Sequence, residues 1–149
     1  MTTELQLFKL SHPTASHWAA GQPTPEQLPQ IKAAGITHIV NLRPAAEDLN
    51  FDEASAAATL GLNYHPLPIS GPADLTLANA QALDTVLAAV GDAPTLIHCA
   101  SSNRVGALMS LRAAWLHGQS ADEALAIGRA YGLTAMEPLV QKLLSEAPR

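Results

Sequence analysis

The chain has 149 residues, a length that suits one folded domain with a substantial core, and we expect a single domain over residues 1–149. Hydrophobic residues make up 48% of it and charged residues 14%, a composition typical of globular rather than disordered chains. The formal net charge is −5 and no basic run occurs, so neither a nucleic acid nor an anionic membrane surface is an expected partner.

A single cysteine excludes an intrachain disulfide and a cysteine-rich metal site. The histidines lack metal-ligand spacings such as His-x3-His, so we expect no metal and no other cofactor. The N-terminus has no basic start followed by an apolar stretch, and no apolar run approaches the roughly 18 residues that suggest a membrane span. These features predict a cytoplasmic protein, and they leave its oligomeric state open.

The N-terminal part of the chain predicts one strand and one helix. Apolar residues alternate weakly over 4–10, which predicts an edge strand, whereas 11–21 has the composition of an irregular segment. Thr24 is a suitable N-cap, and Gln27 completes a capping box for a helix that stops at Gly35.

Short apolar strands and amphipathic helices alternate through most of the remaining chain. The strands are apolar or β-branched runs, and the helices lie between capping residues and glycines. These patterns predict strands over 36–42, 63–69 and 95–97, and helices over 52–60, from 75 or 77 to 90, 105–117, 121–131 and 134–146. The alternation indicates an α/β fold whose central, partly parallel sheet of four to five strands is flanked by helices.

Residues 94–109 carry the strongest chemical signal in the chain. A buried strand ends at His98 and Cys99, a short loop follows, and Arg104 stands at the start of a helix. Such a turn directs backbone N–H groups and the positive end of the helix toward one place, where an anion can bind. Both the helix and Arg104 favour a thiolate, so we expect Cys99 to be a nucleophile and Arg104 to bind an anionic substrate with two hydrogen bonds. A buried structural thiol and a surface arginine are the alternatives.

This arrangement resembles the signature of cysteine-dependent phosphatases of the dual-specificity type. It is more similar still to the bacterial phosphatase-like group related to beta-lactamase hydrolase-like proteins. Two further motifs support the resemblance, namely Gly21-Gln22-Pro23-Thr24 before a helix and Val40-Asn41-Leu42-Arg43-Pro44 at the end of a strand. The likeness covers roughly residues 18 to 110 and implies a phosphatase-like α/β fold.

The resemblance implies hydrolysis of a phosphomonoester, on a small molecule or a protein, through a phosphocysteine at Cys99. The phosphate would be bound by Arg104 and by the preceding residues His98, Ala100, Ser101, Ser102 and Asn103. Hydroxyl donation by the two serines and a purely steric role for them are equally open. His98 is expected to orient the loop through hydrogen bonds.

A phosphatase also needs a proton donor for the leaving oxygen. Asp74 is the first candidate because it lies in a Gly-Pro loop, although it could instead cap the helix that follows. Asp48 is the second candidate. Arg43 could form an ion pair with Glu47 near the site, or both could be solvated.

Two features of the loop depart from the resemblance. Four residues separate Cys99 from Arg104, whereas tyrosine phosphatases have five, and this shorter loop is similar to that of rhodanese-type sulfurtransferases. The related group has glycine where Ser102 stands, so a positive φ there would strain Ser102 by roughly 1 kcal/mol or more. A sulfurtransferase that uses a Cys99 persulfide and a catalytically weak anion-binding module are therefore the alternative functions.

Overall fold

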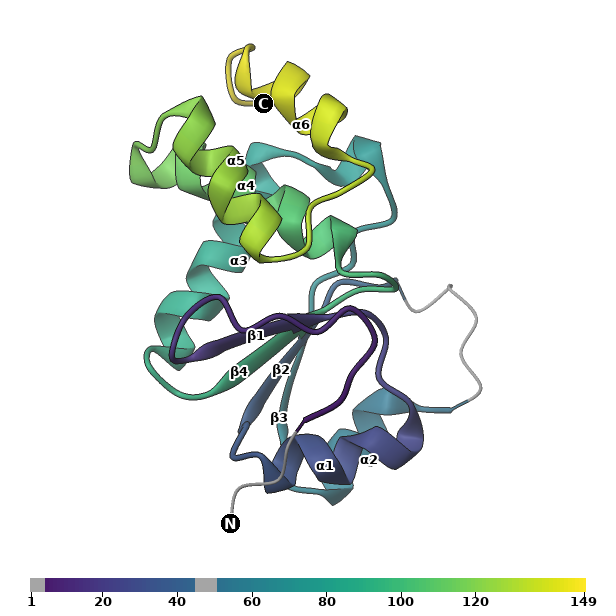
Figure 1. Cartoon of the computed structure of the whole chain (residues 1–149). Helices are drawn as coiled ribbons and strands as arrows, with labels where there is room; N and C mark the ends of the chain where they lie inside the picture. Colours follow the sequence, from purple (N-terminus) through teal and green to yellow (C-terminus); the bar gives the residue numbers. More distant parts are fainter. Residues whose placement is uncertain (1–4, 45–50) are drawn as a thin grey trace.

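The computed structural model describes residues 5–44 and 51–149 and contains one parallel sheet (Figure 1). In these residues the strands are β1 (His17–Ala20), β2 (His38–Asn41), β3 (Asn63–Pro66) and β4 (Thr95–His98). Their spatial order is β1-β4-β2-β3, and every pair is parallel. The central strand β4 is therefore hydrogen-bonded on both sides, and it leads directly to Cys99.

Helices cover both faces of the sheet (Figure 1). One layer contains α1 (Leu28–Ala33), which follows the 3-10 turn η1 (Pro25–Gln27), and α2 (Glu53–Thr59). The other contains η2 (Pro72–Asp74), α3 (Leu77–Val90), α4 (Asn103–His117), α5 (Ala121–Ala130) and α6 (Glu137–Leu144). The sequence prediction of an α/β fold is confirmed, with four strands in the described residues.

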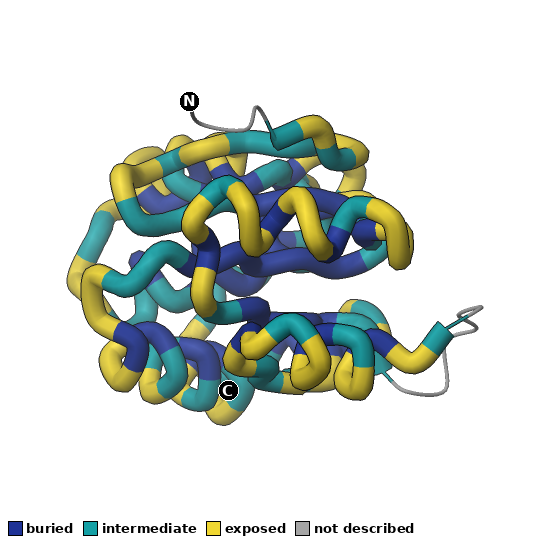
Figure 2. The backbone as a smooth tube through the Cα atoms, turned by 90° about the horizontal axis from the view of Figure 1, so that it is seen from below, coloured by how far each residue is buried: buried dark blue, intermediate teal, exposed yellow. Residues whose placement is uncertain are grey.

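Alternation along the strands gives the molecule two apolar cores, one on each face of the sheet. Ile39 and Leu96 belong to the core under α1 and α2, whereas Val40 and Ile97 belong to the core under α3 to α6. Successive strand side chains point to opposite faces, so the middle of a parallel strand between two helical layers carries apolar side chains on both faces. Figure 2 shows the buried strands between helices whose outer surfaces are exposed.

The prediction of an edge strand over residues 4–10 is wrong for residues 5–10, which the structure describes. The first strand lies instead within residues 11–21, the stretch expected to be irregular. Lys9 has a positive φ of 56° and turns the chain back, so that Ser11 forms an isolated antiparallel bridge with Ala19. The local alternation of apolar residues favoured a strand over residues 4–10, but pairing with β4 decides which segment becomes the strand.

The predicted helices are all present in the described chain, with boundaries shifted by a few residues. The capping boxes of Thr24 with Gln27 and of Ser120 with Glu123 are formed. No helix among residues 5–44 and 51–149 has the length and apolar character needed to cross a bilayer.

Candidate active site

The site is built on the cysteine loop, residues 99–104, which joins β4 to α4. The segment after β1 holds this loop: the Gln22 amide donates to the Ala100 carbonyl at 3.0 Å, and Gly21 forms a bridge with Ser101. A Cβ on Gly21 would lie 2.6 Å from the Ala100 oxygen, closer than real side chains approach. The first motif thus requires glycine because two backbones meet there.

Ser102 has a left-handed backbone, with φ 67° and ψ −9°, at the start of α4. Ser102 thus adopts the positive φ that the sequence analysis considered for this position. The Ser102 hydroxyl donates to the Tyr131 carbonyl at 2.8 Å, and a Cβ on Gly132 would lie 2.3 Å from the Ser102 oxygen. The hydroxyl hydrogen is therefore used within the fold.

Cys99 is 1% exposed, at the base of the loop. Its side chain belongs to the apolar core beneath α3 to α6, and its amide donates to the Ala20 carbonyl at 3.4 Å. A nucleophilic cysteine at the base of an anion-binding loop is buried, and so is a purely structural cysteine. Burial alone therefore does not distinguish the two. Activity measurements must therefore separate these two roles of Cys99.

Arg104 lies in the first turn of α4, and its Nη1 donates to the Ile69 carbonyl at 2.7 Å. This bond ties the cysteine loop to the segment that carries Asp74. The Asp74 carboxylate accepts from the Ser70 amide at 2.7 Å, while Thr76 caps α3 by accepting from the Asn79 amide. Thr76, and not Asp74, is therefore the N-cap of α3. The structure thus does not support the capping role considered for Asp74 as an alternative to proton donation. Asp48 and Glu47 lie outside the described residues.

The remaining loop residues differ in their surroundings. Ser101 is exposed and Ala100 is partly exposed. Asn103 accepts hydrogen bonds from the amides of Thr134 and Met136 at 2.9 and 3.3 Å, so its side-chain oxygen anchors the turn before α6. In the described chain no three or more His, Cys, Asp and Glu side chains gather as a metal site would require.

A buried polar cluster lies directly beneath the loop, and the sequence analysis did not identify its central residue. His98 has no exposed surface, and its Nε2 lies 2.6 Å from the carboxylate of Glu53, which is 3% exposed. Gln22 donates to the other Glu53 oxygen at 2.5 Å, and Arg43 donates to Gln22 at 3.1 Å. Glu53 stands in an alanine-rich helix, where a glutamate is usually solvated, so only the nearby motifs hint at its role.

Together, a cysteine at the end of a central parallel strand, a backbone loop and an arginine on the following helix define a phosphatase-like α/β domain. Residues 10–116 match the family described as the phosphatase-like domain of beta-lactamase hydrolase-like protein. The chain belongs to this family.

Individual relatives agree with this assignment. A beta-lactamase hydrolase-like protein of Xylella fastidiosa is 32% identical over 117 residues, which are 76% of this chain and 27% of that protein. The chain spans about a quarter of the length of the curated relatives it matches.

Solved structures share the fold. A provisionally assigned phosphatase from Neisseria meningitidis has a TM-score of 0.74 at 22% identity, over 91% of this chain and 96% of that one. P. aeruginosa TpbA, solved in complex with pTyr, has a TM-score of 0.67 at 14% identity, over 94% of this chain and 85% of that one. The expectation of a phosphatase-like α/β fold is confirmed.

Proposed function

We propose that this chain is a cysteine-dependent phosphatase that hydrolyses a phosphomonoester of a small molecule or a protein. The observation that carries the proposal is the cysteine loop itself, with Cys99 at its base and Arg104 tied to the segment of Asp74. The family match and the fold support it.

The reaction proceeds in two steps. The Cys99 thiolate attacks phosphorus and the bond from phosphorus to the leaving oxygen breaks, while Asp74 gives that oxygen its proton. Arg104 and the loop N–H groups stabilise the charge on the equatorial oxygens. Water then forms a bond to phosphorus and returns one proton to the Asp74 carboxylate while the phosphorus–sulfur bond breaks, which releases inorganic phosphate and regenerates the thiolate.

The direct test is hydrolysis of para-nitrophenyl phosphate by the full chain and by Cys99→Ser, with Ser101→Ala as a control in the same loop. We expect Cys99→Ser to lose at least about 10³-fold in kcat, whereas the control keeps activity within roughly tenfold because backbone groups bind the phosphate. Circular dichroism checks that both variants fold. Equal turnover by the parent chain and Cys99→Ser would contradict the proposal.

The four-residue spacing favours a second candidate function, sulfur transfer. Here the Cys99 thiolate takes the outer sulfur of thiosulfate, releases sulfite, and passes the sulfur from its persulfide to cyanide. Thiocyanate formation without phosphate release would favour this function. Phosphate binding with no Cys99-dependent turnover would instead identify an anion-binding module.

A further inference from the structure

The motifs that surround the cysteine loop converge on one buried carboxylate, that of Glu53. Gln22 comes from the segment after β1, Arg43 from the end of β2, and His98 from the last position of β4. Glu53 is the first residue of α2, and it contacts His98 at 2.6 Å and Gln22 at 2.5 Å. The proposed reaction assigns no role to this cluster.

The carboxylate of Glu53 is held in its charged form. Burial alone acts to raise the pKa of Glu53, but the hydrogen bond and charge of His98, the hydrogen bond of Gln22 and the charge of Arg43 hold it below its ordinary value. Burial raises the pKa of Tyr64, and the negative charge of Glu53 adds to that rise. Within residues 5–44 and 51–149, the charged or titratable groups around Glu53 are His98 on β4, Arg43 after β2, Tyr64 on β3 and the neighbouring Asp52.

A charged carboxylate can only accept hydrogen bonds, so the Nε2 atom of His98 must carry the hydrogen that joins it to Glu53. The Nδ1 atom of the same ring lies 3.3 Å from the carbonyl oxygen of Cys99, which is also an acceptor. The contact with Glu53 therefore fixes which edge of the His98 ring faces the Cys99 carbonyl.

The direction of the Cys99 carbonyl matters because a peptide unit is planar and trans. Its C=O and the N–H of Ala100 belong to one peptide unit and point in opposite directions. A contact that fixes the Cys99 carbonyl therefore also fixes the first loop N–H available to an anion.

We propose that Glu53 is a positioning residue for the cysteine loop. It holds the His98 ring with Nε2–H toward α2 and Nδ1 toward the Cys99 carbonyl, and thereby aims the Ala100 N–H. This inference rests on the proposed function of Cys99, since the aimed amide matters only if the loop binds a phosphoryl group.

The test compares Glu53→Gln with the parent chain and with Asp52→Ala as a matched control. Asp52 caps the same helix by accepting from the Ser55 amide at 3.1 Å, so its loss weakens the start of α2 without removing the partner of His98. With para-nitrophenyl phosphate we expect kcat to fall at least about tenfold in Glu53→Gln and to change less than twofold in Asp52→Ala. Equal kcat in the two variants would overturn the proposal.

A second readout does not depend on catalysis. In ¹⁵N spectra of the histidine side chains, Nε2 of His98 should carry a slowly exchanging hydrogen in the parent chain, and Glu53→Gln should speed that exchange at least about tenfold. An Nε2 without hydrogen in the parent chain would overturn the proposal, even if Glu53→Gln does not fold. If Cys99→Ser keeps full turnover while the Nε2 hydrogen is observed, the proposed function has failed but the contact with Glu53 has not.

Discussion

Asp74 is the residue on which proton transfer depends in the proposed reaction. We expect Asp74→Asn to lower kcat roughly 10²–10³-fold toward phenyl phosphate, whose leaving oxygen is strongly basic and needs a proton. The loss should be at least about tenfold smaller toward para-nitrophenyl phosphate, because its leaving group departs without full protonation. Steady-state kinetics with both esters measure this difference.

The asparagine variant is a fair test because its side-chain oxygen can still accept from the Ser70 amide, as Asp74 does at 2.7 Å. A merely structural role for Asp74 would lower the rates with both esters by the same factor. That result would remove Asp74 as the acid and direct attention to Asp48.

Ser102 combines a strained backbone with a useful hydrogen bond, and two substitutions separate these effects. Ser102→Ala keeps the positive φ of 67° but loses the bond to the Tyr131 carbonyl, which should cost about 1 kcal/mol. Ser102→Gly loses the same bond and relieves the strain, so it should be about 1 kcal/mol more stable than Ser102→Ala. Chemical unfolding of both variants measures the difference, and equal stabilities would show that Ser102 is not strained.

The sequence predicted the local geometry of the candidate site better than its long-range contacts, for a physical reason. Cys99, Arg104 and the positive φ of Ser102 belong to one continuous turn, whose strand, small residues and helix can be recognised locally. Glu53 meets His98 only after β2, β3 and β4 have paired and α2 has packed on the sheet. Its spacing from the loop carries no signal, so it was missed.

At the scale of elements, glycines let α4 and α5 pack closely. A Cβ on Gly106 of α4 would lie 2.2 Å from the Leu133 nitrogen and 2.6 Å from the Gly128 oxygen. Backbone atoms cannot move aside, so Gly106→Ala should destabilise the fold by about 3 kcal/mol or more. Gly71→Ala is the control, because nothing lies within 4 Å of that added Cβ. Thermal unfolding should show a large fall in Tm for Gly106→Ala and little change for Gly71→Ala. Similar Tm values for the two variants would contradict the close packing.

The attachment of α2 through Glu53 should depend on pH. The pKa of Glu53 in the folded chain lies below its ordinary value of 4.5, so deprotonation favours the folded state above that pH. This stabilisation is lost as the pH falls below 4.5 and through the lower folded-state pKa. Glu53→Gln has no proton to gain there. Its free energy of unfolding should therefore fall less than that of the parent chain between about pH 5 and pH 3, and parallel curves would argue against a charged Glu53.

Helices were predicted more accurately than strands because their signals are local. Caps such as Ser120 and stops such as Gly118 are contained in a few residues, whereas the four residues of β1 become a strand by pairing with β4. The weak alternation over 4–10 was the stronger local signal, yet Lys9 turns the chain there. Non-local pairing decided the edge of the sheet.

At the scale of the whole molecule, the cysteine loop lies where the two helical layers meet at the carboxyl ends of the strands. His98 connects the loop to α2 on one face, and Arg104 connects it to the segment before α3 on the other. An anion bound in the loop would therefore stabilise both layers together. Ligand binding should then raise the midpoint temperature of one unfolding transition shared by the whole domain, rather than stabilise only one part of the chain.

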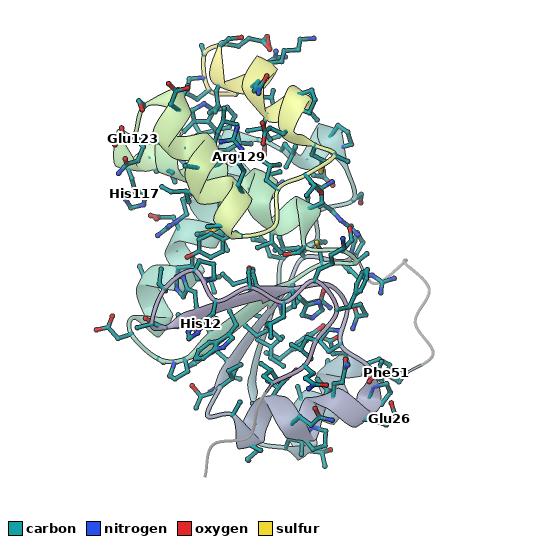
Figure 3. All side chains as sticks on the ribbon, viewed as in Figure 1. His12, Glu26, Phe51, His117, Glu123 and Arg129 are labelled. Carbon is teal, nitrogen blue, oxygen red and sulfur yellow. The ribbon has the colours of Figure 1, made fainter. Side chains whose placement is uncertain are left out.

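Inorganic vanadate is a suitable probe of this coupling because it imitates a phosphoryl group. At about 100 times its dissociation constant it should add about 2.7 kcal/mol to the free energy of unfolding, a rise of roughly 5 to 10 °C in Tm. Arg104→Ala should lose most of this rise, because in the proposed reaction the guanidinium binds the equatorial oxygens. Arg129→Ala removes the same charge from the outer surface of α5, where Arg129 pairs with Glu137, and should keep the full rise (Figure 3).

Sodium chloride at equal ionic strength corrects for screening. Equal rises in the two variants would mean that vanadate binds elsewhere, and two separate transitions would show that the loop does not join the layers.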